Sequence, residues 1–356
     1  MESLKEQVIK FRNTKPSTWK SYETNIRQLS QGLTQNEYIN NDFLQDVTGV
    51  SAWIDTNHTG QSKRRLLYTT ILIMLEPDRS KSKLLQLNGE KNIYLDYQQK
   101  LKQLTKEYED NQLEQKKTKK QEELWASWPI IKSIVKRMRK VFVKNKKEYM
   151  EGDISKEQRT FLQDWLIMAL YTEIAPRRLD YAGMMIMNRK DYNKLTTDEQ
   201  EKHNILVVVG KNKKYFMFGK QVQKNKNLDR NGFYQSTYKL PLPPKLNSIM
   251  NIYLKYANPE EKFKDSINMR TLLYNTLTHK TINKGKGLSK NGLSQSVMRI
   301  TSKWIKKKIS PTLIRTIYYS HLTKNDTKIK FKLDLAEQMG HTKAVAEKYY
   351  GKITTE

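Results

Sequence analysis

Residues 172–184 read TEIAPRRLDYAGM, and this stretch decides how the second half of the chain is built. The apolar run from Phe161 to Leu170 comes before it and predicts a buried helix. After it, Ile205 to Val209 and Tyr215 to Phe218 predict two strands joined by the turn GKNKK. Helices combined with one small antiparallel sheet indicate a mainly α or α+β fold.

The segments on either side extend this pattern. A third strand is predicted from Phe233 to Leu240, ended by PLPP, and the chain after Leu246 is expected to be mostly helical. At the other end, Thr14 to Glu76 predicts a bundle of four short helices. The basic run 63–65 opens the last of these helices, where side chains and backbone N–H groups can meet phosphate.

Composition divides the chain into three parts. Residues 1–90 predict a helical, DNA-binding N-terminal domain. Residues 91–130 contain the run KKTKKQEE, and no proline or glycine occurs between Leu95 and Glu123, so we expect a solvated helical connector. Residues 131–356 are expected to form the domain that carries the chemistry.

The charge and the missing cysteines exclude several classes of protein. The 356 residues include 66 Lys plus Arg and 37 Asp plus Glu, a net charge of +29. Neutralising a phosphate releases condensed counterions, so this excess favours a nucleic acid as partner. The absence of cysteine excludes disulfides, thiolate zinc sites and cysteine nucleophiles. No apolar run of about 18 residues and no secretory signal occur, so we expect an intracellular protein that associates with DNA and not with a membrane.

Common catalytic motifs are missing. HExxH, GxxxxGK[ST] and GxSxG do not occur, and the five histidines show no metal-ligand spacing. We therefore expect neither a metal nor another cofactor. A three-carboxylate, metal-dependent nuclease stays open as an alternative, because such carboxylates can lie far apart in a sequence. The basic runs KKTKK and KWIKKK predict DNA contacts or solvated faces, and they could also serve as nuclear import signals.

Two later stretches add chemistry-bearing residues in a fixed order. In SPTLIRTIYYSHL, residues 310–322, Ser310 predicts a helix cap and Arg315 lies one turn into the helix. In MGHTKAVAEKYYGK, residues 339–352, a glycine ends one helix, His341 follows it, and two tyrosines come eight and nine residues later. Together with TEIAPRRLDYAGM, the order is arginine, arginine, histidine, tyrosine.

This ordered set resembles the tyrosine recombinase (phage-integrase) family. The family has an R-x-x-[ED]-[LY] box, a second arginine box, a G-[HW] pair and a tyrosine about nine residues beyond it. The matching residues are Arg177, Asp180, Tyr181, Arg315, Gly340, His341 and Tyr350. The segment LYTEIAPRRLDY is similar to the corresponding segment of integrases of DNA viruses, virophages and related mobile elements. The resemblance covers about residues 150 to 356, and the N-terminal bundle resembles the family's core-binding domain.

The resemblance implies a site-specific DNA recombinase or integrase that cuts and rejoins strands through a covalent 3′-phosphotyrosine, without metal or ATP. Tyr350 would be the nucleophile, and Arg177 and Arg315 would bind the phosphate oxygens, which suit bidentate guanidinium groups. His341 would hydrogen-bond the phosphate. The family's acid is a hairpin lysine, for which we predict Lys224.

The family also implies an assembly. Four protomers would form a homotetramer on paired sites of double-stranded DNA, with the two domains of each protomer gripping opposite faces of the duplex. Whether the tyrosine acts in cis or in trans stays open.

Several assignments have rivals in the sequence. Arg178 competes with Arg177 and Tyr349 with Tyr350, and the family's spacing favours Arg177 and Tyr350. Asp180 is expected to buttress an arginine or cap a helix. The alternative to Lys224 is Lys220, whereas the lysines at 211, 213 and 214 are predicted to contact phosphate. Thr312 occupies the position where the family most often has histidine.

Two other functions fit the same residues. A type IB topoisomerase uses the same constellation without pairing two DNA sites. A catalytically inactive DNA-binding protein of a mobile element would keep the fold and lose the chemistry.

Overall fold

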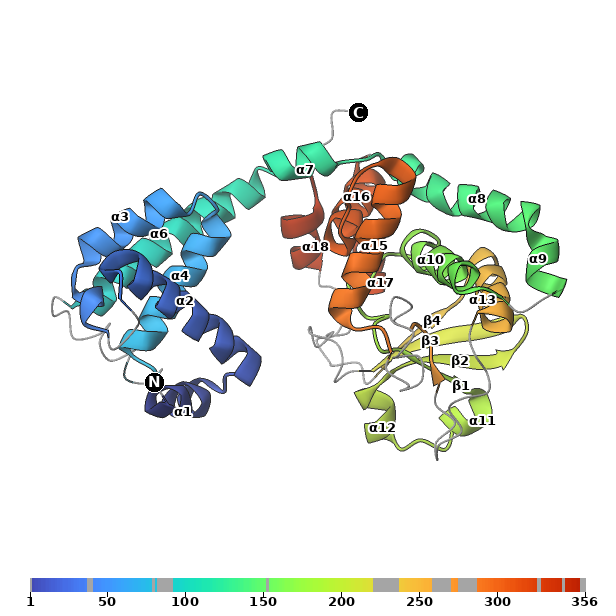
Figure 1. Cartoon of the computed structure of the whole chain (residues 1–356), viewed down its shortest axis with the longest axis horizontal. Helices are drawn as coiled ribbons and strands as arrows, with labels where there is room; N and C mark the ends of the chain where they lie inside the picture. The colour runs from blue at the N-terminus through green and yellow to red at the C-terminus, as the bar shows by residue number, and fades with distance from the viewer. Residues whose placement is uncertain are drawn as a thin grey trace. The chain divides into compact units, whose positions relative to one another are not determined.

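The computed structural model describes residues 2–36, 41–78, 81, 92–151, 154–219, 237–257, 270–274, 287–324, 328–340 and 343–352. The chain forms two compact units, Met1–Glu114 and Gln115–Glu356, and each has a hydrophobic core of its own (Figure 1). In the described part of the chain, no helix combines the length and the apolar character needed to span a membrane.

The first unit is helical, as the sequence predicts. Its elements are α1 (Glu2–Arg12), α2 (Pro16–Thr34), the 3-10 turn η1 (Asp42–Gln45), α3 (Val47–Asn57), α4 (Gln61–Leu75) and α6 (Ile93–Leu113). The apolar stripe of α2 faces inward, with Ile26 and Leu29 fully buried against Ile54, Leu67 and Ile71. Full burial of each such side chain contributes about 1.5–3 kcal/mol to the stability of this bundle.

Helix α6 differs from the solvated connector that we expected at residues 91–130. Its Tyr97 is fully buried, and the phenol donates a 2.9 Å hydrogen bond to the carbonyl oxygen of Leu44. Helix α6 therefore packs on the first unit, and the division between units falls after Glu114. The charged residues of α6 occupy its exposed side, which is why composition alone suggested a solvated helix.

The basic run that opens α4 makes contacts inside the first unit. The Lys63 ammonium donates to Asn25 Oδ1 at 2.8 Å. Arg64 pairs with Asp55 at 3.3 Å, and the Arg65 guanidinium lies 4.5 Å from the ring centroid of Tyr108. All three cations have partners inside the unit and are partly exposed, so their contact with phosphate stays a prediction.

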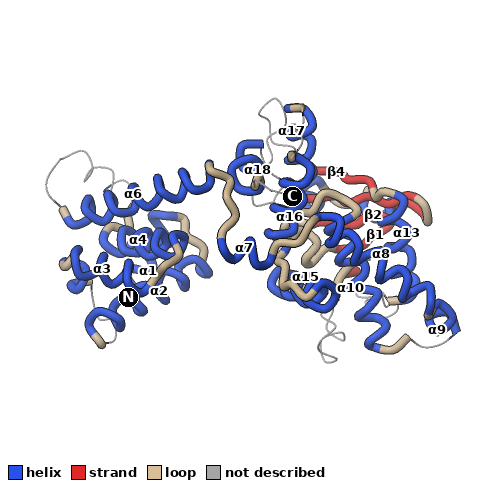
Figure 2. Tube along the Cα trace, turned by 90° about the horizontal axis from the view of Figure 1, so that it is seen from above, coloured by secondary structure: helices blue, strands red, loops and turns tan. Residues whose placement is uncertain are grey.

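The second unit combines many helices with one small sheet. Its helices are α7 (Lys119–Leu124), α8 (Trp128–Lys144), α9 (Lys146–Glu151), α10 (Lys156–Thr172), α11 (Arg189–Tyr192), α12 (Thr197–Lys202), α13 (Pro244–Tyr256), α15 (Lys290–Ile305), α16 (Pro311–Thr323), α17 (Ile329–Gln338) and α18 (Lys343–Tyr350). The strands are β1 (Met185–Asn188), β2 (Asn204–Gly210), β3 (Lys213–Gly219), β4 (Thr237–Pro241) and β5 (Arg270–Thr271). Figure 2 shows these strands in red among the blue helices. The mainly α, α+β fold class is confirmed.

The sheet has the strand order β4-β3-β2-β1-β5. Strands β2, β3 and β4 pair antiparallel, with Val207 opposite Tyr215. Strand β1 pairs parallel with β2, so the sheet is mixed, although the sequence suggested an antiparallel one. A parallel pair needs a crossover, which the segment with α11 and α12 provides. The sequence analysis did not identify β1 and β5, which have only four and two residues.

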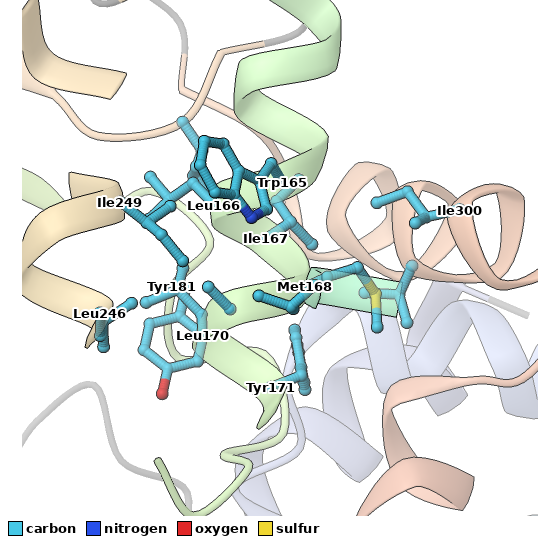
Figure 3. Packing of buried hydrophobic residues seen from close by; sticks show 14 of the residues in the cluster. Trp165, Leu166, Ile167, Met168, Leu170, Tyr171, Tyr181, Leu246, Ile249 and Ile300 are labelled. Atoms are coloured by element: carbon cyan, nitrogen blue, oxygen red, sulfur yellow. The ribbon is translucent and has the colours of Figure 1, made fainter. Parts of the chain in front are cut away.

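Helix α10 is the centre of this unit. Ser155 caps it through a capping box with Gln158, and its residues 162–172 are all buried. It packs against α8, α13 and α15. Figure 3 shows Trp165 and Met168 of this helix together with Ile249 of α13 and Ile300 of α15. Helix α10 ends at Thr172, immediately before the segment that carries the first arginine box, so the core of the unit determines where that box begins.

Candidate active site

The first arginine box follows the end of α10. The Arg177 side chain is only 1% exposed, and its Nε donates to Asp180 Oδ2 at 2.7 Å. Its guanidinium carbon lies 4.0 Å from the ring centroid of Phe218 on β3 and 5.5 Å from that of Tyr238 on β4. The neighbouring Arg178 is exposed. Folding therefore selects Arg177 as the buried arginine of the box, and Asp180 buttresses it as predicted.

Two further contacts fix this segment against the sheet. Tyr181 is fully buried, and its ring lies 5.9 Å from Tyr171 and 5.7 Å from Phe216 between ring centroids. The side chain of Asn204 donates to the Asp180 carbonyl at 2.8 Å and accepts from the Gly219 backbone at 3.0 Å. Asn204 thereby joins the arginine box to the end of β3.

The second arginine lies on α16. Ser310 caps this helix by accepting from the Leu313 backbone at 3.2 Å, as predicted. Arg315 is 1% exposed, and its Nη2 donates to the Met339 carbonyl at 3.0 Å. Its Nε and Nη1 are buried and have no hydrogen-bond partner among the described residues. Burial lowers the pKa of Arg315, while the nearby Tyr350 and Asp180 act in the opposite direction.

The end of α17 brings the two arginines together. The Gln338 carbonyl accepts from Arg177 Nη1 at 2.9 Å, and the next carbonyl, that of Met339, accepts from Arg315. Gly340 has φ +73°, and a Cβ there would lie 2.7 Å from Arg177 Nη2. Glycine is thus required both by the backbone conformation and by the closeness of the guanidinium.

The tyrosine comes from the last helix. Tyr350 ends α18, and the Arg315 guanidinium carbon lies 4.9 Å from the centroid of its ring, within the range of a cation–π contact. The Ser320 hydroxyl donates to the Tyr350 carbonyl at 2.9 Å and accepts from the Lys352 backbone at 2.9 Å. Ser320 lies on α16, like Arg315. One helix therefore positions both the second arginine and the tyrosine.

The structure brings together three of the predicted site residues, Arg177, Arg315 and Tyr350. Lys224, its alternative Lys220, His341 and the side chain of Tyr349 lie outside the described residues. Thr312 is exposed in the first turn of α16.

The prediction for one lysine of the β2–β3 turn was wrong. The Lys214 side chain is buried, and its ammonium donates to Asn247 Oδ1 at 3.1 Å and to the Lys211 carbonyl at 2.8 Å, so it is not turned to phosphate. Lys211 and Lys213 are exposed on the same turn.

The sequence analysis missed Ser320, Asn204 and the two carbonyls at the end of α17. Backbone carbonyls carry no residue signal, and a serine or asparagine inside an element has many possible roles. Gly340 offered a usable signal, because a glycine after a helix indicates a left-handed cap.

No protein-family model and no curated protein matches this chain. A crystal structure of XerA recombinase is similar to it with a TM-score of 0.34 and 10% sequence identity, and the match covers 99% of this chain and 94% of that one. The similarity is distant.

Proposed function

We propose that this chain is a site-specific DNA recombinase of the tyrosine type, which cuts and rejoins strands through a 3′-phosphotyrosine at Tyr350. One observation carries the proposal: two buried arginines from distant segments are bound by consecutive carbonyls, and one of them lies against the ring of Tyr350. The order of the boxes in the sequence and the net charge of +29 support it independently.

The two arginines suit the charge that develops during phosphoryl transfer. The attacked phosphorus gains a fifth oxygen, and its non-bridging oxygens carry two negative charges. Arginine presents several N–H donors in a plane and keeps its charge even when buried. Arg315 Nε and Nη1, which have no partner among the described residues, are donors from which such an oxygen can accept. An arginine at transition-state phosphate charge contributes roughly 10³ to 10⁵ in rate in phosphoryl-transfer enzymes.

Tyr350 needs help to act as a nucleophile. A free tyrosine has a pKa near 10, so about one phenol in a thousand is ionised at pH 7. A cation near the phenol favours the phenolate as it attacks the phosphorus. Arg315, which lies against the ring, is the group that supplies this charge in the proposal. The bond to DNA keeps the energy of the broken phosphodiester, so rejoining needs no ATP.

The leaving 5′-oxygen needs a proton donor, for which we propose Lys224, with Lys220 as the alternative. The segment 220–236 that contains both begins after β3 and ends before β4. The residues on its two flanks, Phe218 and Tyr238, both contact Arg177. Asn204 holds Gly219 against the arginine box. These contacts support placing the acid near the two arginines. His341 directly follows Gly340 and is proposed as a further phosphate donor.

The proposed partner is double-stranded DNA, and the proposed assembly is a homotetramer on two paired sites inside a cell. The first unit would act as the core-binding domain. The resemblance of LYTEIAPRRLDY supports an integrase of a DNA virus, a virophage or a related mobile element.

The test uses a nicked suicide duplex made from the element's own terminal DNA. We expect a covalent protein–DNA band that resists SDS and EDTA in the parent chain and disappears in Tyr350→Phe. An adduct lost in Tyr349→Phe but kept in Tyr350→Phe would transfer the role to Tyr349. No adduct in any variant would reject the chemistry and favour an inactive DNA-binding protein, and cleavage that vanishes with EDTA would favour a metal-dependent nuclease.

A second readout separates the two enzymatic functions. A recombinase yields joined products from two sites in a sequence-dependent manner. Relaxation of supercoiled DNA without sequence preference and without a tetramer would instead indicate a topoisomerase.

A further inference from the structure

The outer face of α8 is the most basic helical surface in the described part of the second unit. Between Trp125 and Lys147 the chain has no acidic residue. The exposed cations on α8 are Lys132, Lys136, Arg137, Arg139, Lys140 and Lys144. The opposite face is apolar, with Ile131, Ile134 and Met138 buried in the core that α8 shares with α10 and α15. The helix is therefore fixed by its apolar side and presents its cations outward.

Four of these cations form a narrow stripe. With about 100° between successive residues, Lys132, Lys136, Arg139 and Lys140 fall within an arc of about 100° on the helix. They span roughly 12 Å along its axis, since each residue adds about 1.5 Å. None of the four makes an ion pair with a described residue. Some exposed cations elsewhere in the chain do form ion pairs, for example Arg27 with Glu23 and Lys202 with Asp198.

The basic surface continues onto the end of α15. Arg137 Nη2 donates to the Trp304 carbonyl at 2.7 Å, and its guanidinium lies 5.4 Å from the Trp304 ring, so the last turn of α15 borders α8. The two helices are in contact. Lys306 and Lys308, from the run KWIKKK, are exposed just beyond that turn. No acidic residue occurs anywhere from Ser266 to Asn325.

Like charges at this density repel one another, and a folded protein keeps such a surface at a cost in stability unless an anion neutralises it. Lys132, Lys136 and Lys140 follow one another at about 6 Å along the helix. This row of cations matches a partner whose charges also repeat in a line. The backbone of a nucleic-acid duplex is such a partner, and contacts to it need no base readout.

We propose that the surface formed by the outer face of α8 and the end of α15 binds the phosphate backbone of a nucleic-acid duplex, outside the site of Arg177, Arg315 and Tyr350. The residues of that site come from other parts of the unit: the segment after α10, α16 and α18. Binding at this surface does not depend on the base sequence of the duplex. It adds affinity or holds a second stretch of duplex. This proposal does not depend on the chemistry at Tyr350.

The test compares two fourfold variants of the full chain. The stripe variant carries K132Q, K136Q, R139Q and K140Q. The control variant carries R159Q, K190Q, K245Q and K255Q, which removes the same number of lysines and arginines from exposed positions elsewhere in the second unit. Both are made in the Tyr350→Phe background, so that binding is measured without strand cleavage. Circular dichroism confirms that both remain folded.

The measurement is the salt dependence of binding to a random-sequence duplex, followed by fluorescence anisotropy. Each phosphate contact contributes about 0.9 to the slope of log K against log salt concentration. We expect the stripe variant to lose about 3 to 4 from this slope and the control variant less than about 1. Equal slopes in the two variants would overturn the proposal. The surface would then be solvated only, or it would bind an acidic protein. Formation of the Tyr350 adduct is a separate measurement, so failure of one proposal leaves the other testable.

Discussion

Lys214 and Arg315 are both buried cations of the second unit, and their surroundings differ. The Lys214 ammonium has oxygen partners on several sides: the carbonyls of Gly210 and Lys211 and the side-chain oxygens of Asn247 and Asn251. Arg315 has one, the Met339 carbonyl, and two of its nitrogens have no partner among the described residues. Burial lowers the pKa of both groups.

Burial of a charge is therefore not a sufficient sign of function. The buried Lys214 ammonium has hydrogen-bond partners on both elements and so joins the β2–β3 turn to α13. The Arg315 guanidinium has two nitrogens without a partner among the described residues and lies beside a tyrosine, which is what the proposed binding of a phosphate needs. The predictions below test whether this difference separates a structural cation from a functional one.

The largest effect is expected from replacing Arg315. Arg315→Lys keeps a positive charge but loses the planar set of donors, so adduct formation on a suicide duplex should fall by about 10³ or more. The folded state should stay intact, because Arg315 makes one side-chain hydrogen bond to the residues that the structure describes. Single-turnover kinetics and a thermal melt check both statements.

Replacing Lys214 should have the opposite effects: a loss of stability with little change in adduct formation. Lys214→Met leaves several buried oxygens without a donor, and we expect a loss of about 1–3 kcal/mol in the free energy of unfolding. Adduct formation should stay within about twofold at a temperature where the variant is folded. Loss of activity in folded Lys214→Met would show that the distinction between the two cations is wrong.

Gly340→Ala should give the next largest effect. The new Cβ would meet the Arg177 guanidinium at 2.7 Å and displace it, and misplacing a reacting group by about 1 Å can cost about 10² in rate. Gly183→Ala is the control, since Gly183 also has positive φ, +67°, but nothing lies within 4 Å of its Cβ position. Both variants should lose similar stability from backbone strain. A similar loss of adduct formation in both would argue against the contact with Arg177.

Ser320→Ala should have a moderate effect. It removes the hydroxyl that joins the Tyr350 carbonyl and the Lys352 backbone to α16. With each hydrogen bond worth about 0.5–1.5 kcal/mol, we expect adduct formation to fall by roughly tenfold at unchanged DNA affinity. Thr323→Ala removes a hydroxyl from the same helix whose one hydrogen bond to a described residue goes to the Tyr319 carbonyl, and it should leave the rate unchanged. Ser320→Thr should restore part of the rate.

The smallest effect concerns pH. Burial lowers the pKa of Lys214 in the folded protein. Between the folded and the unfolded pKa of this group, the unfolded chain therefore binds more protons than the folded chain. Stability contributed by this group should rise as pH increases from the folded pKa toward about 10.4 and level off beyond it. Urea unfolding of the parent and Lys214→Met at several alkaline pH values checks this. Parallel pH curves for the two proteins would contradict the shift.

The sequence predicted much of this comparison, but not all of it. The apolar periodicity of α10 and the cap at Ser310 predicted the helices, and the spacing of the boxes selected Arg177, Arg315 and Tyr350, which the fold brings together. The two short strands β1 and β5 were missed, because their pattern is too brief to distinguish from a loop. The hydrogen bonds of the Lys214 ammonium could not be predicted, because their acceptors Asn247 and Asn251 lie on a helix more than 30 residues away in the sequence.

Some residues around the candidate site have no sequence pattern, because they act through backbone carbonyls or through single hydrogen bonds. Carbonyls of Gln338 and Met339 bind the arginines regardless of their side chains. Asn204 and Ser320 act by hydrogen bonds across distant segments, which a single sequence does not encode as a motif. Helix α6 was misread for a different reason: its charged outer side dominates its composition and hides Tyr97.

The most direct measurement is the identity of the atom that joins protein and DNA. Trypsin should release Tyr349-Tyr350-Gly351-Lys352 with the nucleotide attached, and fragmentation in a mass spectrometer can assign the modified residue. We predict a 3′-phosphate ester on the oxygen of Tyr350. A nucleotide on Tyr349, a linkage to the 5′ end, or a cleaved duplex with no covalent peptide would contradict an active site built from Arg177, Arg315 and Tyr350.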